Sequence, residues 1–574
     1  MGRSCCFVVC FLCLFVVCVR CSFVLVVGDV STHNVRVLHE SLQQEDYTSS
    51  LRTFDNEILG VQYWEYSCKP RVSVFEDLAP GTRYRVCFEE NGEENSSCED
   101  FVEFQTVSSH PEPQNFTVVS CNRYIEDRDT FMWDSLTDTH AQQEIHSGTF
   151  HLGDQIYADH IPHDFVEQYG ELILDPESCV SFKTLVGLFR SYYRITWSHR
   201  STYSTLRHGP NWMIPDDHEL INNANPEFWK GLVAPPKQPE ISQHLVQFIM
   251  RAGVQAYLEY QYQLYSDIPD LSATQNCCIP SFSEPAAMRE CEETWEQYDA
   301  AVERFLSDHG FSIYRKIGNT AIIMLDSRYE RIWRDSSVQD SPHPWIGTAG
   351  FSRFENQMQQ LESEYKTTDR ILIFTGTPMF FASSAMARLA YEVEGDKYPT
   401  HPDIDRDLKK IMERLFRSPL WDKITLLSGD LHIYFESEIC DWYTSRCIPQ
   451  VITSGMSKGS NAIRNIIAYL FDLVAFRIWK PWMFTRNLFL TVQYSSIFMS
   501  NNYLTVTING SEIAYLPYWR PLESKRDLLL QFVFDYAASI VYLVILNGII
   551  LAVTSITIKR KRNETCRRNK RKNR

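Results

Sequence analysis

The chain has 574 residues, of which 44% are apolar, so it can bury a large core and we expect at least two domains. Its formal net charge of -17 argues against a nucleic-acid-binding surface, which would need a basic stripe to displace counterions from phosphates. The positive charge is also unevenly placed, because ten basic residues lie in the last sixteen positions.

The N-terminal residues 1–21 are typical of a secretory signal peptide. Arg3 supplies the basic start, an apolar run comes next, and cleavage is expected near Ser22. An uncleaved signal anchor is the alternative.

Residues 22–110 contain short runs of alternating apolar side chains separated by polar turns, which predicts an antiparallel β-sandwich. The stretch 78–86 (LAPGTRYRV) resembles the strand connection of fibronectin type III domains, in which the ring of Tyr84 would pack inward and its hydroxyl would cap the corner. We interpret this domain as a support for the larger region C-terminal to it, although an adhesion module is the other interpretation. Residues 110–113 (HPEP) predict a stiff linker.

Residues 111–515 alternate strand-like apolar runs with helical stretches, an α/β pattern. The predicted strands include residues 116–120, 148–154, 319–326, 370–376 and 423–430, and the predicted helices lie near 181–195, 243–265 and 353–365. Asp154, Asp326 and Asp430 stand where a strand ends. Because ligands collect at the carboxyl ends of strands in open α/β sheets, we expect these acids to converge.

Three blocks carry residues that can bind metal ions. In 151–159 (HLGDQIYAD), Gly153 permits a tight turn, Asp154 can bridge two cations, and Tyr157 offers a phenolate. In 211–223 (NWMIPDDHELINN), Asp217 and its neighbouring acids would repel one another unless cations stabilise them. In 426–432 (LLSGDLH), alternation along the extended chain predicts Asp430 and His432 on one side. Singly, each block is most often a surface turn, but together they favour a metal site.

These blocks closely resemble the PhoD-like alkaline phosphatase and phosphodiesterase family, a branch of the calcineurin-like metallophosphoesterases. The resemblance extends over residues 20–515. Shorter matching pieces lie in the same order as in the family: 120–121 (SC), 325–328 (LDSR), 376–379 (GTPM) and 453–455 (TSG).

The resemblance implies a four-layer αββα domain after the sandwich, with a ferric ion and a calcium ion as cofactors. The implied ligands of the iron are Cys121, Asp154, Tyr157 and Asp430. Asp154 would bridge to the calcium, whose implied ligands are Asp217, Asn222 or Asn223, and His432. His218 would protonate the leaving group, and Arg328 would hold a phosphate oxygen in bidentate fashion.

The C-terminal region predicts a membrane anchor. Residues 536–558 form 23 uncharged positions, enough for a transmembrane helix, and the basic block 559–574 comes directly after them. The predicted topology is single-pass type I, with the catalytic domain lumenal or extracellular and the tail cytosolic. Residues 570–574 resemble a retrieval signal, so both the cell surface and the endoplasmic reticulum are open. The aromatic segment 465–490 is too charged for a second span and indicates core packing or an interfacial helix.

Ten cysteines lie between these two ends, which is compatible with an oxidising compartment. Cys87 with Cys98, and Cys440 with Cys447, flank short turns and could each close a hairpin. On the predicted outer side of the membrane, three N-glycosylation sequons begin at Asn95, Asn115 and Asn509.

The expected function is metal-dependent hydrolysis of phosphate monoesters or diesters in a lumenal or extracellular space. One alternative keeps the enzyme but makes the substrate a lipid or glycolipid phosphoester, because of the membrane anchor. Another is a catalytically inactive surface receptor or adhesion protein.

Overall fold

The computed structural model describes residues 22–90, 98–110, 112–126, 130–142, 146–174, 180–220, 222, 239–271, 278–279, 292–329, 345–381, 384, 387–388, 391–392, 396–458, 490–498 and 502–519. The predicted signal peptide, transmembrane segment and basic tail lie outside these ranges, as does most of the aromatic segment 465–490. Among the helices in these ranges, none has the length and apolar character needed to cross a membrane.

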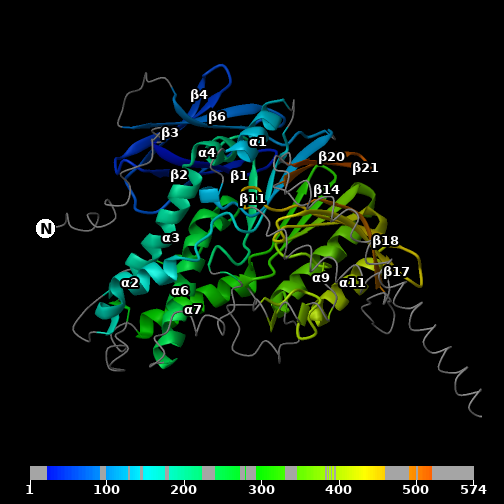
Figure 1. The fold of residues 1–574 in the computed structure, drawn as a ribbon. Coiled ribbons are helices and arrows are strands. Elements are labelled where there is room, and N and C mark those ends of the chain that lie inside the picture. Colours follow the sequence, from blue (N-terminus) through cyan, green and yellow to red (C-terminus); the bar gives the residue numbers. More distant parts are fainter. Residues whose placement is uncertain are drawn as a thin grey trace, which may run out of the picture.

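The N-terminal part forms two antiparallel sheets that share one core (Figure 1). The first sheet has the order β1 (Phe23–Val30), β2 (Val35–Ser41), β5 (Arg71–Phe75). The second has the order β4 (Ile58–Trp64), β3 (Tyr47–Thr53), β6 (Arg83–Glu90), β7 (Asp100–Gln105). β3 is the strand that the pattern of alternation did not indicate, because its sequence YTSSLRT is mostly polar.

The turn before β6 has the predicted geometry. Gly81 adopts a positive φ of 65°, and the buried Tyr84 accepts a hydrogen bond from the backbone N–H of Ala79 at 2.9 Å. A disulfide connects Cys87, inside β6, to Cys98, which comes just before β7. The proposed disulfide between Cys440 and Cys447 is also present.

Two larger mixed sheets contain most of the other strands that the structure describes. The five-stranded sheet has the order β11 (Asn211–Ile214), β9 (Gly148–Leu152), β8 (Gln114–Val119), β20 (Asn502–Asn509), β21 (Glu512–Trp519), with β11, β9 and β8 parallel. The seven-stranded sheet has the order β13 (Ile313–Ile317), β14 (Thr320–Leu325), β15 (Arg370–Thr375), β16 (Ile424–Ser428), β18 (Cys447–Ile452), β17 (Tyr434–Asp441), β19 (Leu490–Phe498). Strands β14, β15, β16 and β18 are parallel.

The two sheets pack face to face. The rings of Phe150 on β9 and Phe374 on β15 stack across the interface, with centroids 4.4 Å apart. Helices α9 (Gly347–Ser363) and α11 (Asp405–Arg417) cover the other face of the seven-stranded sheet, and α1 (Phe131–Gln142) packs on the other face of the five-stranded sheet. The order of layers is therefore helix, sheet, sheet, helix.

Helix α4 (Arg200–Leu206) packs against α1 and β1. Helices α2 (Ile161–Leu174), α3 (Phe182–Trp197), α6 (Pro239–Tyr260) and α7 (Glu292–Asp308) lie together beside the sheets (Figure 1). A short ladder of β10 (Val180–Ser181) and β12 (Cys278–Ile279) accompanies them. The N-terminal sheets contact these helices through the buried carboxylate of Glu40. It accepts hydrogen bonds from Arg194 on α3 at 2.6 Å and from the hydroxyl of Tyr260 on α6 at 2.6 Å. The sandwich is thus attached by specific polar contacts.

Replacing Tyr84 by phenylalanine should destabilise the sandwich. The change removes the acceptor of the Ala79 N–H while leaving the buried ring, so we expect a loss of about 1 kcal/mol. Chemical denaturation of the purified protein measures it. Tyr63→Phe is the matched control, because that side chain is 80% exposed. Equal midpoints for the two variants would contradict the role assigned to the corner.

Candidate metal centre

The candidate site lies where three strands end. β8 runs into Cys121, β9 into Asp154 and β16 into Asp430, so residues more than 300 positions apart meet at one edge of the two sheets. The backbone there is strained. Cys121, Asp154, Asp430 and His432 all have positive φ, between 55° and 70°. Non-glycine residues in this region cost on the order of 1–3 kcal/mol each and cluster at functional sites.

Glycines permit the close approach of these strand ends. A Cβ on Gly429 would lie 2.8 Å from the carbonyl oxygen of Leu152, which belongs to the other sheet. A Cβ on Gly153, whose φ is 88°, would lie 2.9 Å from the backbone nitrogen of Asp216. Any side chain at either position would force the loops apart.

The thiol of Cys121 lies at the centre of the site and is fully buried, outside any disulfide. It donates to Asp154 Oδ2 at 3.3 Å and lies 3.1 Å from Ser454 Oγ and 3.0 Å from Ser120 Oγ. Burial raises the pKa of this thiol to about 11, although both serine hydroxyls oppose the shift. Because Cys121 is not half of a disulfide, its thiol can serve as a ligand once it is deprotonated.

Asp154 belongs to two groups of potential ligands. In one, its carboxylate lies with the Cys121 thiol and the His432 imidazole, and in the other with Asp217 and His218. Within each group the ligand atoms are all within 4.8 Å of one another. The hydroxyl of Tyr157 connects to the first group, because it donates to Asp154 Oδ2 at 3.3 Å and lies 3.2 Å from His432 Nε2.

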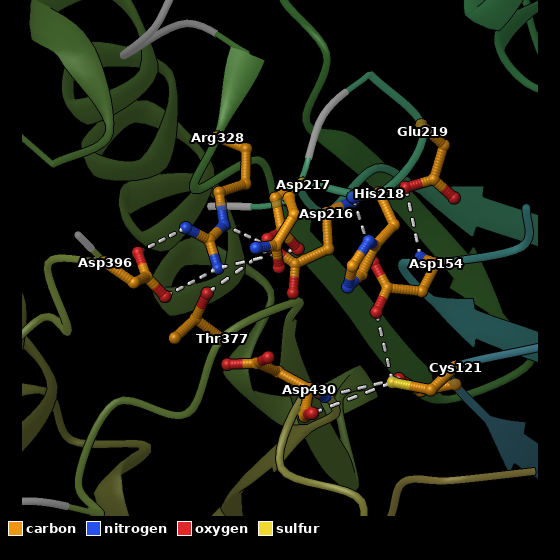
Figure 2. Close-up of polar contacts among 12 residues, drawn as sticks. Cys121, Asp154, Asp216, Asp217, His218, Glu219, Arg328, Thr377, Asp396 and Asp430 are labelled. Carbon is orange, nitrogen blue, oxygen red and sulfur yellow. Dashed lines mark hydrogen bonds and ion pairs between the residues drawn. The ribbon is translucent and has the colours of Figure 1, made fainter. Parts of the chain in front are cut away.

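This arrangement changes the expected partners of His432 and Asp430. The resemblance placed His432 with Asp217, whereas the structure places it beside Tyr157. Cys121 reaches Asp430 only through the backbone carbonyl, at 3.8 Å, and the carboxylate of Asp430 points away from the thiol (Figure 2). The left-handed backbone at both residues accounts for the difference, because simple extended alternation no longer applies.

His218 lies on the opposite side of Asp154. Its Nδ1 is 2.7 Å from Asp159 Oδ1, and its ring stacks on Tyr157 with centroids 4.0 Å apart. Burial disfavours the imidazolium, but the carboxylates of Asp217 and Asp159 outweigh it and raise the pKa of His218 to about 9. Asn222 is exposed, and its backbone N–H donates to the same Asp159 oxygen at 2.8 Å.

Arg328 does not have the predicted role. Its guanidinium is 1% exposed and forms a bidentate pair with Asp396, at 2.7 and 3.1 Å, while Nε donates to Asp216. The fork expected to hold a phosphate is thus directed at carboxylates of the protein (Figure 2). The physical reason is charge, because buried acids next to the site require a cation and Arg328 provides it.

Glu219 joins the two acidic loops. Its fully buried carboxylate accepts from the backbone N–H groups of Asp154 at 3.0 Å, Gln155 at 2.6 Å and Asp216 at 3.0 Å. The side chain of Gln261, just after α6, donates to it as well, at 3.2 Å. One carboxylate therefore fixes the backbone on both sides of Asp154.

Glu219, Asp216, Asp159 and Asp396 were missed as contributors. The first three stand inside the blocks 151–159 and 211–223, so the signal was present, although their partners were not foreseeable. Asp396 comes from a separate loop before α11, and no pattern in the sequence marks it.

The residues present suit a cation. Burial, followed by repulsion from Cys121 and from the neighbouring acids, raises the pKa of Asp154 well above its usual range. Burial and Asp216 likewise raise the pKa of Asp430, whose Oδ2 is buried without a hydrogen-bond partner among the described residues. Thiol, phenol, imidazole and carboxylate are all metal ligands once deprotonated, and a cation would reverse these shifts.

Known proteins share this architecture. A family model of PhoD-like phosphatases matches residues 116–452, more than half of the chain. A solved structure described as the structure of PhoD has a TM-score of 0.56 and 13% sequence identity, over 86% of this chain and 88% of that chain. That identity shows the fold alone.

Two further comparisons add nothing to the assignment. A β-glucuronidase from Ruminococcus gnavus matches with 9% identity over 71% of this chain and 61% of that chain, but its TM-score of 0.22 carries no argument. No curated protein matches. The family match, which contains Cys121, Asp154, Asp217 and Asp430, decides the matter: this chain belongs to the PhoD-like phosphatase family and is a phosphoric ester hydrolase.

Proposed function

We propose that the chain hydrolyses phosphate monoesters or diesters with water activated at a two-metal site. The observation that carries this proposal is the position of Asp154, whose carboxylate is shared by two separate groups of potential ligands. A carboxylate between two cations is a common feature of sites that clamp a transferring phosphoryl group.

The donor atoms differ on the two sides of Asp154. Cys121, Tyr157 and His432 offer sulfur, a phenolate and an imidazole, a set that suits a ferric ion better than calcium. Asp217 on the other side offers oxygen, which calcium prefers. Asp430 has a carboxylate oxygen that is buried without a hydrogen-bond partner among the described residues, and this carboxylate lies on the side of Asp216 rather than of the thiol. Asn222 stays a candidate at the exposed rim. When bound, such a metal pair would polarise the phosphoryl oxygens and lower the pKa of a bound water.

His218 is the proposed general acid. The Asp159 carboxylate is hydrogen-bonded to Nδ1 of His218, so Nε2 of His218 is the nitrogen that can deliver a proton to the leaving oxygen. The Asp159 carboxylate fixes the ring and stabilises its protonated form, and stacking on Tyr157 holds its plane.

Arg328 and Glu219 act indirectly in this proposal. Arg328 neutralises Asp216 and Asp396, which lets the Asp216–Asp217 segment stay buried beside the metals. Glu219 holds the backbone of Asp154 and Asp216. We therefore assign both as positioning residues.

We further propose a lumenal or extracellular location, with the domains bounded as the sequence predicts. Two disulfides, Cys87–Cys98 and Cys440–Cys447, support it, since such bonds persist in oxidising compartments. The predicted signal peptide and membrane span agree with the same location.

A second candidate substrate is a lipid phosphoester, favoured by where β21 ends. Trp519 pairs with Asn502, and the side-chain amide of Asn502 donates a hydrogen bond to the backbone carbonyl of Ser454. The hydroxyl of Ser454 lies next to the Cys121 thiol. The chain thus leaves β21 at the site end of the sheet, 16 residues (520–535) before the predicted span.

Asp154→Asn should abolish phosphatase activity. The purified protein should hydrolyse p-nitrophenyl phosphate or its bis ester, and chelation should remove that activity. We expect the variant to lose more than the roughly 10- to 100-fold that removal of an outer-shell partner costs. Asp55→Asn, at an exposed position, is the control. An inactive surface receptor would instead show neither activity nor bound metal, and activity surviving in Asp154→Asn would show that the site is misassigned.

Glu219→Gln should weaken metal binding without removing a ligand. The amide keeps the shape but points an NH₂ group at backbone donors, so the Asp154 loop loses part of its support. We expect a fall of roughly 10- to 100-fold in metal affinity, measured by titration of the chelated protein. Glu167→Gln, on the exposed face of α2, should match the wild type. Unchanged affinity in Glu219→Gln would refute the positioning role.

The lipid candidate predicts faster turnover by the anchored enzyme. Full-length protein reconstituted in vesicles that contain a phosphoester lipid should exceed a detergent-free form ending before residue 536, while both hydrolyse p-nitrophenyl phosphate equally. Equal rates on the vesicles would count against a lipid substrate.

A further inference from the structure

The two sequons within the described residues differ in their exposure to solvent. Asn95 lies outside those residues, but Asn115 and Asn509 belong to neighbouring parts of the five-stranded sheet. A glycosylated Asn-x-Ser/Thr triplet must lie at the surface of the folded protein, because the attached oligosaccharide is bulky and solvated. The two triplets differ sharply in this respect.

The Asn115 triplet is enclosed in the sheet. β8 is an interior strand, paired with β9 on one side and β20 on the other. Asn115 Oδ1 accepts from Thr507 Oγ1 at 2.8 Å, and the hydroxyl of Thr117 is buried against His140 Nε2 at 3.2 Å. A sugar on Asn115 would separate β8 from β20, and β8 leads directly to Cys121.

The Asn509 triplet occupies the turn between β20 and β21. Asn509 pairs with Glu512, so Gly510 and Ser511 are the two residues of the hairpin loop. Gly510 has a φ of 58°, with no atom within 4 Å of where a Cβ would stand, and Asn509, Gly510 and Ser511 are all exposed. Glycine supplies the turn, and the turn presents both required side chains to solvent.

The position of this turn is compatible with catalysis. β20 runs antiparallel to β8, and Ile508 pairs with Gln114 at the start of β8, whereas the candidate metal centre lies just past the end of β8. Asn509 borders an open cavity of about 240 Å³ at that opposite end of the sheet. An oligosaccharide there would cover neither Asp154 nor His218.

We propose that Asn509 is N-glycosylated and that Asn115 is not, an inference that rests on the lumenal location proposed above. The donor is an oligosaccharide carried on a polyprenyl diphosphate. The amide nitrogen of Asn509 forms a bond to C1 of the first sugar, the bond from C1 to the diphosphate oxygen breaks, the lipid diphosphate leaves, and the amide proton passes to a base of the transferase. The Ser511 hydroxyl is required for recognition.

The test uses the full chain expressed in animal cells with Asn95→Gln, so that Asn115 and Asn509 are the sequons left before the predicted membrane span. Peptide N-glycosidase F should shift this protein on a gel by one oligosaccharide. Asn509→Gln and Ser511→Ala should each lose the shift, whereas Ser511→Thr and Asn115→Gln should keep it. Mass spectrometry of the parent protein should find the Asn115 peptide unmodified, which covers the case that Asn115→Gln fails to fold.

A shift that survives in Asn509→Gln, or a sugar on the Asn115 peptide, would overturn the proposal. So would a parent protein without any shift. Hydrolysis of p-nitrophenyl phosphate by the same samples separates this failure from failure of the proposed function, because activity without a shift refutes the glycosylation alone. Asn509→Gln itself should retain full activity, since it lies at the end of the sheet opposite the metal centre.

Discussion

Buried acids that repel one another are the constraint on which the rest of this structure depends. Asp154, Asp216 and Asp217 are nearly inaccessible to solvent, and Asp430 reaches the same space from the second sheet. Without a cation, burial and mutual repulsion raise the pKa of Asp154 and of Asp430 well above the usual range of a carboxyl group. Strained strand ends, glycines that admit neighbouring backbone and a dedicated arginine are all arranged around this cluster. Bound cations would stabilise the folded site and so offset the free energy that this arrangement costs.

The protein controls the cluster through groups that never need to touch substrate. Arg328 forms ion pairs with Asp216 and Asp396. Glu219 fixes the backbone around Asp154. Asp159 orients the ring of His218. Each contact crosses between loops that are remote in sequence. Pairing of β9 with β11 brings Glu219 to Asp154 and Asp159 to His218, and packing of the two sheets brings Arg328 to Asp216. This dependence explains why the catalytic region needs the whole α/β core.

Sequence patterns predicted the strand ends well and the directions of the side chains less well. Apolar runs that end in Gly-Asp placed Asp154 and Asp430 at one edge, because such runs are buried strands. The side that His432 occupies was not predictable, since its left-handed backbone depends on tertiary contacts with Ser454. The role of Arg328 was also hidden, because Asp396 approaches it only in the folded chain. β3 was missed because its buried positions include the polar residues Ser49 and Ser50, which interrupt the alternation of apolar side chains.

The most direct test is a crystal structure of the metal-loaded protein with anomalous scattering measured at the iron edge. We predict an anomalous peak bonded to Cys121 and Asp154, with a second cation on the Asp217 side of the same Asp154 carboxylate. A map without metal density, in which Asp154 and Asp430 form hydrogen bonds as neutral acids, would contradict this assignment.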